Sequence, residues 1–166
     1  MKTKTDEISR KVLERIVPQN SERNSVENLA KQIMEKVSNA SQKSLLNAKV
    51  SLEGSVAKDT WLSGEADIDI FLQVESKLER KDLETTCLEV ARQAIKGHKA
   101  IERFAEHPYI ETLIGKTRVN IVPCYQVEKG KWKSATDRTP FHTAYVKKNL
   151  DSELRDEIRL LKKFMK

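Results

Sequence analysis

The sequence predicts an α+β fold, with a small mixed or antiparallel sheet flanked by helices. Two kinds of periodicity support this class, because several segments place apolar residues at helical spacing and several shorter ones favour extended backbone. Length is the third observation, since 166 residues, 38% of them hydrophobic, suffice for one globular domain with a buried core.

The N-terminal part of the chain predicts two amphipathic helices. Residues 5–16 open with a capping candidate and stop before Pro18, which cannot continue a helix. Residues 21–37 carry a wide apolar stripe, which predicts a helix with one buried face. The stripe consists of Val26, Leu29, Ala30, Ile33, Met34 and Val37.

Two strands are predicted on either side of a polar stretch. Residues 49–53 form the first and lead into a turn at Gly54-Ser55, and residues 67–74 form the second, which alternates strictly between two faces. One face is apolar and is predicted to meet the core: Ile68, Ile70, Leu72 and Val74. The other face carries the remaining side chains: Asp67, Asp69, Phe71 and Gln73.

The next segments predict one helix and the rest of the sheet. Apolar residues recur at helical spacing over residues 79–96. Short strands are predicted after it over residues 101–104, 109–114 and 117–122. We expect Gly115-Lys116 to join the last two strands as a hairpin, and Pro123 to end the third.

The C-terminal part predicts two helices and holds the excess positive charge. One helix begins at Thr139-Pro140 and another at Ser152. Residues 129–166 contain 11 basic and 5 acidic residues, which accounts for the whole net charge of +6. Part of this charge forms one stripe along the last helix: Arg155, Arg159, Lys162 and Lys166. A polyanionic partner is expected at this end, although a solubilising surface explains an excess of this size equally well.

The chain is predicted to hold one domain over residues 1–150, with residues 151–166 starting a helix that leads into a following domain absent from it. No segment reaches the roughly 18–20 apolar residues of a membrane helix, and the N-terminus lacks the apolar stretch of a signal peptide. Cys87 and Cys124 are too few for a disulfide framework. These features predict a cytoplasmic protein that contacts no membrane.

Residues 54–69 combine two features that nucleotidyl transfer needs. The glycine of a Gly-Ser turn lets the backbone approach a phosphate, and the serine supplies N–H and O–H donors. Asp67 and Asp69 point the same way from a strand, about 6–7 Å apart, and can hold a hard cation such as Mg²⁺. Taken singly, an ordinary turn and a solvated sheet face explain these patterns as well. Together they point to metal-dependent chemistry on a nucleoside triphosphate.

GSVAKDT followed by DIDI resembles the signature of the polymerase-beta-like nucleotidyltransferase superfamily. Within it, five segments resemble successive blocks of the archaeal-type (class I) CCA-adding enzymes: GSVAKDTWLSGEADIDIF, FAEHPYIE, VNIVPCY, SATDRTPFHTAYV and EIRLLKKFMK. The resemblance covers residues from about 19 to 166. It implies that residues 1–150 are a catalytic head domain and that C, C and A are added without a template to the tRNA 3′ end from CTP and ATP. It further implies Mg²⁺ as cofactor, the tRNA acceptor end as partner and a homodimer of the full-length protein.

The resemblance also implies roles for individual residues. Asp67 and Asp69 match metal ligands, and Asn120 falls where the family has a third metal-binding carboxylate. The positions that match nucleotide contacts are Ser55, Lys58, His142 and Lys162. Lys58 stands where the family usually has arginine, which keeps the charge but loses a bidentate donor.

Asn120 is the departure from the family pattern with the largest consequence. An amide oxygen binds a hard cation more weakly than a carboxylate and cannot take a proton from the attacking 3′-hydroxyl. We therefore expect a two-ion site with one weakened ion, and nucleotide binding with slowed transfer. Two alternatives stay open: another nucleotidyltransferase of the poly(A) polymerase kind, against which the RTPFH block argues, and a non-catalytic RNA- or nucleotide-binding module, which Asn120 favours.

Overall fold

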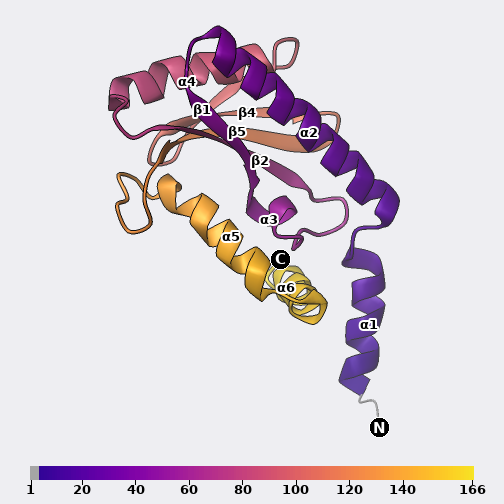
Figure 1. Ribbon diagram of the computed structural model, residues 1–166. Coiled ribbons are helices and arrows are strands. Elements are labelled where there is room, and N and C mark those ends of the chain that lie inside the picture. The colour runs from indigo at the N-terminus through magenta and orange to yellow at the C-terminus, as the bar shows by residue number, and fades with distance from the viewer. Residues whose placement is uncertain (1–3) are drawn as a thin grey trace.

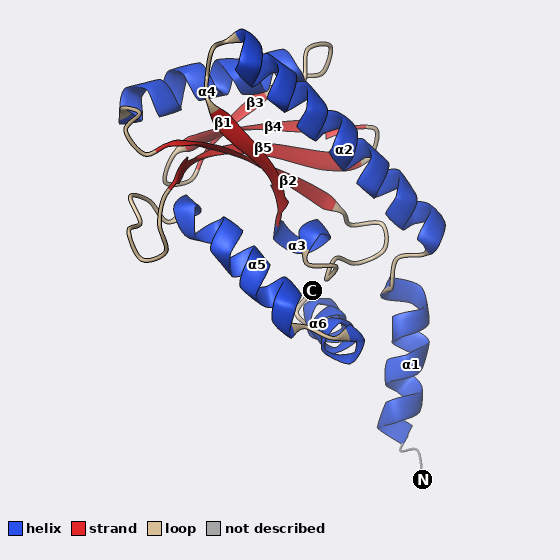
Figure 2. Cartoon of the chain, viewed as in Figure 1, coloured by secondary structure: helices blue, strands red, loops and turns tan. Residues whose placement is uncertain are grey.

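A five-stranded mixed sheet lies at the centre of the molecule, with helices on both of its faces (Figures 1 and 2). The computed structural model describes residues 4–166. The strands follow the spatial order β1-β2-β5-β4-β3, and only the β2–β5 pair is parallel. Their bounds are Ala48–Glu53 (β1), Asp67–Glu75 (β2), Ile101–Phe104 (β3), Pro108–Ile114 (β4) and Thr117–Gln126 (β5). The predicted fold class is confirmed, and the sheet is mixed.

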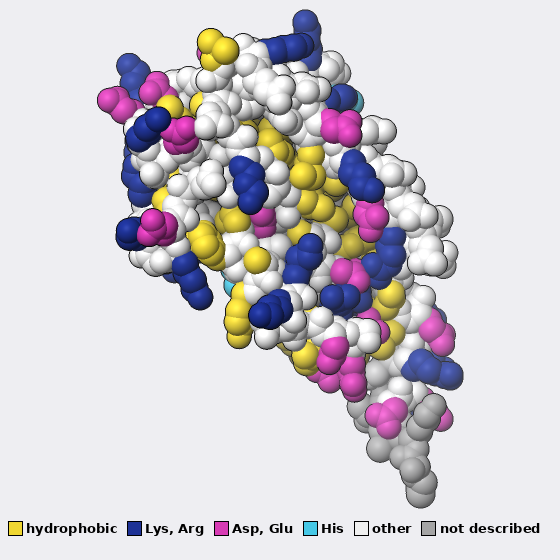
Figure 3. Space-filling model, viewed as in Figure 1, with side chains coloured by type: hydrophobic (Ala, Val, Ile, Leu, Met, Phe, Trp, Pro, Cys, Tyr) yellow, Lys and Arg dark blue, Asp and Glu magenta, His cyan; other side chains and the backbone are white. Residues whose placement is uncertain are grey.

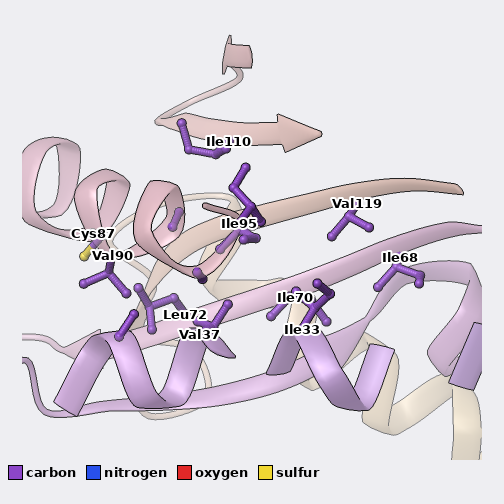
Figure 4. Packing of buried hydrophobic residues seen from close by; sticks show 14 of the residues in the cluster. Ile33, Val37, Ile68, Ile70, Leu72, Cys87, Val90, Ile95, Ile110 and Val119 are labelled. Carbon is purple, nitrogen blue, oxygen red and sulfur yellow. The ribbon is translucent and has the colours of Figure 1, made fainter. Parts of the chain in front are cut away.

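Two long helices, α2 (Asn20–Lys43) and α4 (Arg80–Ala94), cover one face of the sheet. The predicted core set of β2 is confirmed, because all four of its apolar side chains are fully buried. In Figure 4, Ile33 and Val37 of α2 lie beside Ile70 and Leu72 of β2. Burying each such side chain contributes about 1.5–3 kcal/mol, so this face supplies much of the folding free energy.

The opposite face carries the shorter helices. Helix α5 (Thr139–Asn149) crosses it beside the single-turn α3 (Gly54–Ala57). On this face of β2, Phe71 and Gln73 are buried, whereas Asp67 and Asp69 at the start of the strand are half-buried. The remaining helical elements are α1 (Lys4–Ile16), the 3₁₀ turn η1 (Thr136–Arg138) and α6 (Ser152–Phe164), which contacts α1. Within residues 4–166, no helix is both long and apolar enough to cross a membrane.

Strand β5 runs further than predicted. It continues through Pro123 to Gln126, so the expectation that this proline ends the strand was wrong. Strand β4 pairs with β5 only as far as Ile121, whereas β2 pairs with it to the end. Beyond Ile121, β5 therefore has a strand neighbour on one side only, a position where the missing N–H of proline is tolerated. The hairpin prediction is confirmed, since Ile114 pairs with Thr117 across Gly115-Lys116.

A buried aspartate fixes the segment that connects β5 to α5. Asp137 is 1% exposed, and its carboxylate accepts hydrogen bonds from the backbone N–H groups of Tyr125, Lys133 and Ser134 at 2.7–2.9 Å. The Ser134 hydroxyl donates a fourth bond at 2.9 Å. Because Asp137 lies two residues before Thr139, these bonds fix where α5 begins.

Candidate active site

Strands β2 and β5 bring the predicted metal ligands together on the face that carries α5. Their parallel register places Asp69 opposite Asn120 and Asp67 opposite Arg118. The Asn120 amide Nδ2 donates to Asp69 Oδ1 at 2.9 Å. Two residues separated by about fifty positions in the sequence therefore share one polar cluster at the start of the two central strands.

The Gly54-Ser55 turn lies directly against this cluster. Helix α3 begins at Gly54, immediately after β1, with φ +70° in the left-handed region. A Cβ atom at this position would overlap the Asp69 carboxylate, so only glycine lets the turn come this close. Ser55 follows in the same turn, and Lys58 caps the C-terminal end of α3.

A cavity of about 260 Å³ opens beside these residues. Gly54, Asp69 and Asn120 line one part of it, and Thr139 at the start of α5 lines another. Aromatic and aliphatic side chains complete the wall: Phe71, Tyr109 and Val122. The cavity thus combines a polar end suited to phosphate and cation chemistry with an apolar wall.

At the polar end of the cavity, the protein does not fully stabilise the Asp69 carboxylate or the Asn120 amide oxygen. Burial raises the pKa of Asp69; the hydrogen bond from Asn120 opposes this shift and the Asp67 charge adds to it. Asn120 Oδ1 is buried and accepts no hydrogen bond. A hard cation would satisfy both groups, and two carboxylates with an amide oxygen are a donor set that suits Mg²⁺. Throughout residues 4–166, no three His, Cys, Asp or Glu side chains gather into a metal site.

Arg118 is part of this site, and sequence reasoning missed it. Its guanidinium lies 3.5 Å from Asp67 Oδ2 and 3.7 Å from Glu111 on β4. Both members of the Arg118–Asp67 pair are about half exposed, so solvent screens their attraction. The alternation of β5 puts Arg118 on the same face as Asn120, but the register that places it beside Asp67 is a tertiary feature.

The predicted nucleotide contacts divide into two groups. Lys58 and Lys162 lie near each other: burial, and then the positive charge of Lys58, lower the pKa of Lys162. The charge of Lys58 also acts on Asp69. His142 is exposed on α5, three residues after Thr139 of the cavity wall.

The basic stripe of the last helix does not form an open surface, which corrects the sequence-based expectation. Arg159 and Lys162 bond to the backbone of residues 59–61, whereas Lys166 pairs with Glu65 and stays about half exposed. The apolar side of α6 is the exposed one, with Leu161 58% and Met165 77% exposed. These basic side chains face the loop because they donate hydrogen bonds to its backbone carbonyls and pair with one of its carboxylates. On the face shown in Figure 3, lysine and arginine side chains are scattered and form no single patch.

Comparison with known proteins places the chain in a family. Residues 30–142 match the nucleotidyltransferase domain. The chain is 39% identical to a CCA-adding enzyme of Methanothermobacter thermautotrophicus, over 93% of the chain and 35% of that protein. It is 40% identical to the CCA-adding enzyme of Methanopyrus kandleri, over 97% of the chain and 33% of that protein. The chain therefore spans about a third of the length of these relatives.

Solved structures show the same fold at low sequence identity. A cytoplasmic RNA terminal U-transferase superimposes with a TM-score of 0.68 at 14% identity, covering 94% of this chain and 42% of that one. CdnC of E. coli MS115-1, solved with ATP, gives a TM-score of 0.68 at 18% identity, covering 93% of this chain and 55% of that one. The sequence matches to the two CCA-adding enzymes confirm the predicted resemblance. Together with the match over residues 30–142, they show that the chain belongs to the nucleotidyltransferase domain family.

Proposed function

We propose that this chain carries the catalytic head domain, residues 1–150, of an enzyme that adds C, C and A to the tRNA 3′ end from CTP and ATP. The observation that carries the proposal is the contact between the Gly54 turn and the half-buried Asp69–Asn120 pair. That contact puts a phosphate-binding backbone beside cation ligands, in a chain whose relatives are named CCA-adding enzymes.

The carboxylates of Asp67 and Asp69 and the amide oxygen of Asn120 would hold Mg²⁺. When bound, Mg²⁺ neutralises the triphosphate and the charge that develops during transfer. The three side chains fit this task because they offer only oxygen donors and because the Asn120 oxygen has no other partner. The chain itself contributes the geometry, since Gly54 lets the phosphate-binding turn approach the carboxylates.

Ser55, Lys58 and Lys162 would bind the triphosphate. Burial, and after it repulsion by the positive charge of Lys58, lowers the pKa of Lys162 in the free protein. A polyanion between them would relieve that repulsion and favour their charged forms. His142, exposed on α5 three residues after Thr139 of the cavity wall, would also contact the nucleotide.

The reaction would join the tRNA 3′-hydroxyl oxygen to the α-phosphorus of CTP or ATP. The bond between the α-phosphorus and the bridging oxygen breaks, and pyrophosphate leaves in line. Asn120 cannot accept the hydroxyl proton, which would instead pass to solvent water. We therefore expect bound nucleotide to react slowly in this chain.

The test compares the protein with its Asn120→Asp variant on tRNA that lacks its CCA end, with Mg²⁺, CTP and ATP. The variant should add nucleotides at least about tenfold faster, because a general base contributes roughly 10²–10⁴-fold. Asn39→Asp is the matched control, since it adds the same charge at an exposed position of α2 on the other sheet face. A rate for Asn120→Asp no higher than the parent's would contradict the proposed role of this position.

Asn120 also favours a second candidate, a non-catalytic module that binds RNA or nucleotide. The same experiment separates the two functions. If the parent and Asn120→Asp are both inert yet bind tRNA, the module is the better account. Addition of A alone to an RNA other than tRNA would instead indicate a poly(A) polymerase-like enzyme.

A further inference from the structure

The loop that follows α3 is held in an unfavourable backbone conformation. It begins directly after Lys58, and its first residue, Asp59, has φ +53°, in the left-handed region that non-glycine residues avoid. A conformation of this kind persists only where the surroundings impose it. Part of these surroundings is local, since Asp59 N bonds to Val56 O and Thr60 N to Ser55 O at the end of α3, and side chains from the other end of the chain supply the rest.

Side chains of α6 bind three successive backbone carbonyls of this loop. Arg159 donates to the carbonyl of Asp59 at 2.6 Å and to that of Trp61 at 3.1 Å. Lys162 donates to the carbonyl of Thr60, between them, at 2.8 Å. The Arg159 side chain is only 3% exposed, so water cannot readily replace it as a donor. Helix α6 therefore sets the path of the loop across some hundred residues of sequence.

The Asp59 carboxylate ties the loop to two helices. Its Oδ1 atom accepts from Arg159 at 2.6 Å and from Arg23 of α2, and Arg155 lies 3.6 Å from Oδ2. Three guanidinium groups thus converge on one carboxylate. Removing its charge would leave them to repel one another beside the loop.

Lys58 stands immediately before this carboxylate, and Lys162 is bonded to the loop itself. Lys58 is two residues from Thr60, to which Lys162 is bonded. Its positive charge opposes the rise that burial causes in the pKa of Asp69 and adds to the fall that burial causes in the pKa of Lys162, so its ammonium group lies within electrostatic reach of both. The path of the loop therefore decides how Lys58 and Lys162 face each other.

We propose that Asp59 and Arg159 are positioning residues of the nucleotide site, a role that rests on the proposed function. They hold the loop so that Lys58 and Lys162 face one triphosphate. Arg159 does not touch substrate, because it is buried and bonds to the loop, Asp59 and Asp156. The Asp59 carboxylate bonds to Arg159 and Arg23, and its negative charge makes it no ligand for a triphosphate. Their effect should fall on nucleotide affinity and leave the chemical step unchanged.

The test is the dissociation constant for Mg·CTP and Mg·ATP, measured by calorimetry, with KM and kcat from the tRNA assay. Asp59→Asn keeps the side-chain shape and tolerates the left-handed backbone, but it removes the charge. We expect its dissociation constants and its KM to rise at least fivefold, with kcat within twofold of the parent's. Asp59→Gly removes the carboxylate and relieves the backbone conformation, so it should bind as weakly as Asp59→Asn.

Asp156→Asn is the matched control. It removes the other carboxylate partner of Arg159, at 2.8 Å, without touching the loop, so its dissociation constants should stay within twofold. Equal affinity of the parent and Asp59→Asn would overturn the positioning role while leaving the proposed function in place. An equal loss in Asp156→Asn would overturn it too, because the effect would then follow from the stability of α6. A parent that binds neither nucleotide would overturn the proposed function and the positioning role with it.

Discussion

A glycine and a carboxylate set the geometry of the candidate site at the scale of single residues. Gly54 has a left-handed backbone and no side chain, and the Asp69 carboxylate occupies the space a Cβ atom would need. The resulting contact keeps the candidate phosphate-binding turn beside the candidate cation ligands. Replacing the glycine therefore costs both backbone energy and packing.

Gly54→Ala should lower the free energy of unfolding by roughly 2–4 kcal/mol, of which about 1–2 kcal/mol comes from the left-handed backbone. Gly64→Ala is the control, because Gly64 has φ +75° and nothing lies within 4 Å of its added Cβ. It should show the backbone cost alone. Urea unfolding of the three proteins measures both values, and equal losses in the two variants would mean that the Asp69 contact adds nothing.

At the scale of elements, α5 depends on a single buried carboxylate. Asp137 receives its hydrogen bonds from the segment just before α5 and from the end of β5, so it couples the helix to the central sheet. Both Thr139 and His142 take their positions from this anchor. The element that borders the cavity is thus fixed by a residue outside the cavity.

Asp137→Asn should lower the free energy of unfolding by roughly 2–4 kcal/mol, because an amide NH₂ cannot accept from the buried donors that now point at the carboxylate. Asp151→Asn is the control. Asp151 accepts one bond, at 2.9 Å, from Leu154 N at the exposed start of α6, and asparagine caps helices equally well. Its loss should stay below about 0.5 kcal/mol. A small loss for Asp137→Asn as well would contradict the anchoring role.

The elements themselves follow closely from local sequence patterns. The alternation of β2 predicts which side chains meet the core, and the Gly115-Lys116 turn predicts its hairpin. Pro123 was misread because tolerance of a proline depends on whether a neighbouring strand needs its N–H, which only the sheet reveals. The stripe on α6 was identified correctly as a stripe, but its direction depends on carbonyls of a loop far away in the sequence.

At the scale of the whole molecule, the two faces of the sheet have different roles. One face, under α2 and α4, is apolar and supplies stability, and the other brings the turn after β1, the starts of β2 and β5, and α5 around one cavity. The turn and the carboxylates of this site were predicted from the sequence motif. The contacts of Arg118 with Asp67 and of Arg159 with Asp59 could not be predicted locally, because strand register and helix docking create them.

The most direct test of the account is incorporation of labelled CTP and ATP into tRNA lacking its CCA end, by the parent and by Asp69→Asn, with Mg²⁺ or with a chelator. Burial raises the pKa of Asp69, so the native state holds that proton more tightly than the unfolded chain, and stability is lost as the pH rises from the ordinary aspartate pKa to the raised one. Asparagine avoids this cost, and the variant should melt at the parent's temperature or above at neutral pH. The account predicts slow, Mg²⁺-dependent incorporation by the parent and none by the folded variant. Incorporation that persists in Asp69→Asn, or in the chelator, would contradict it.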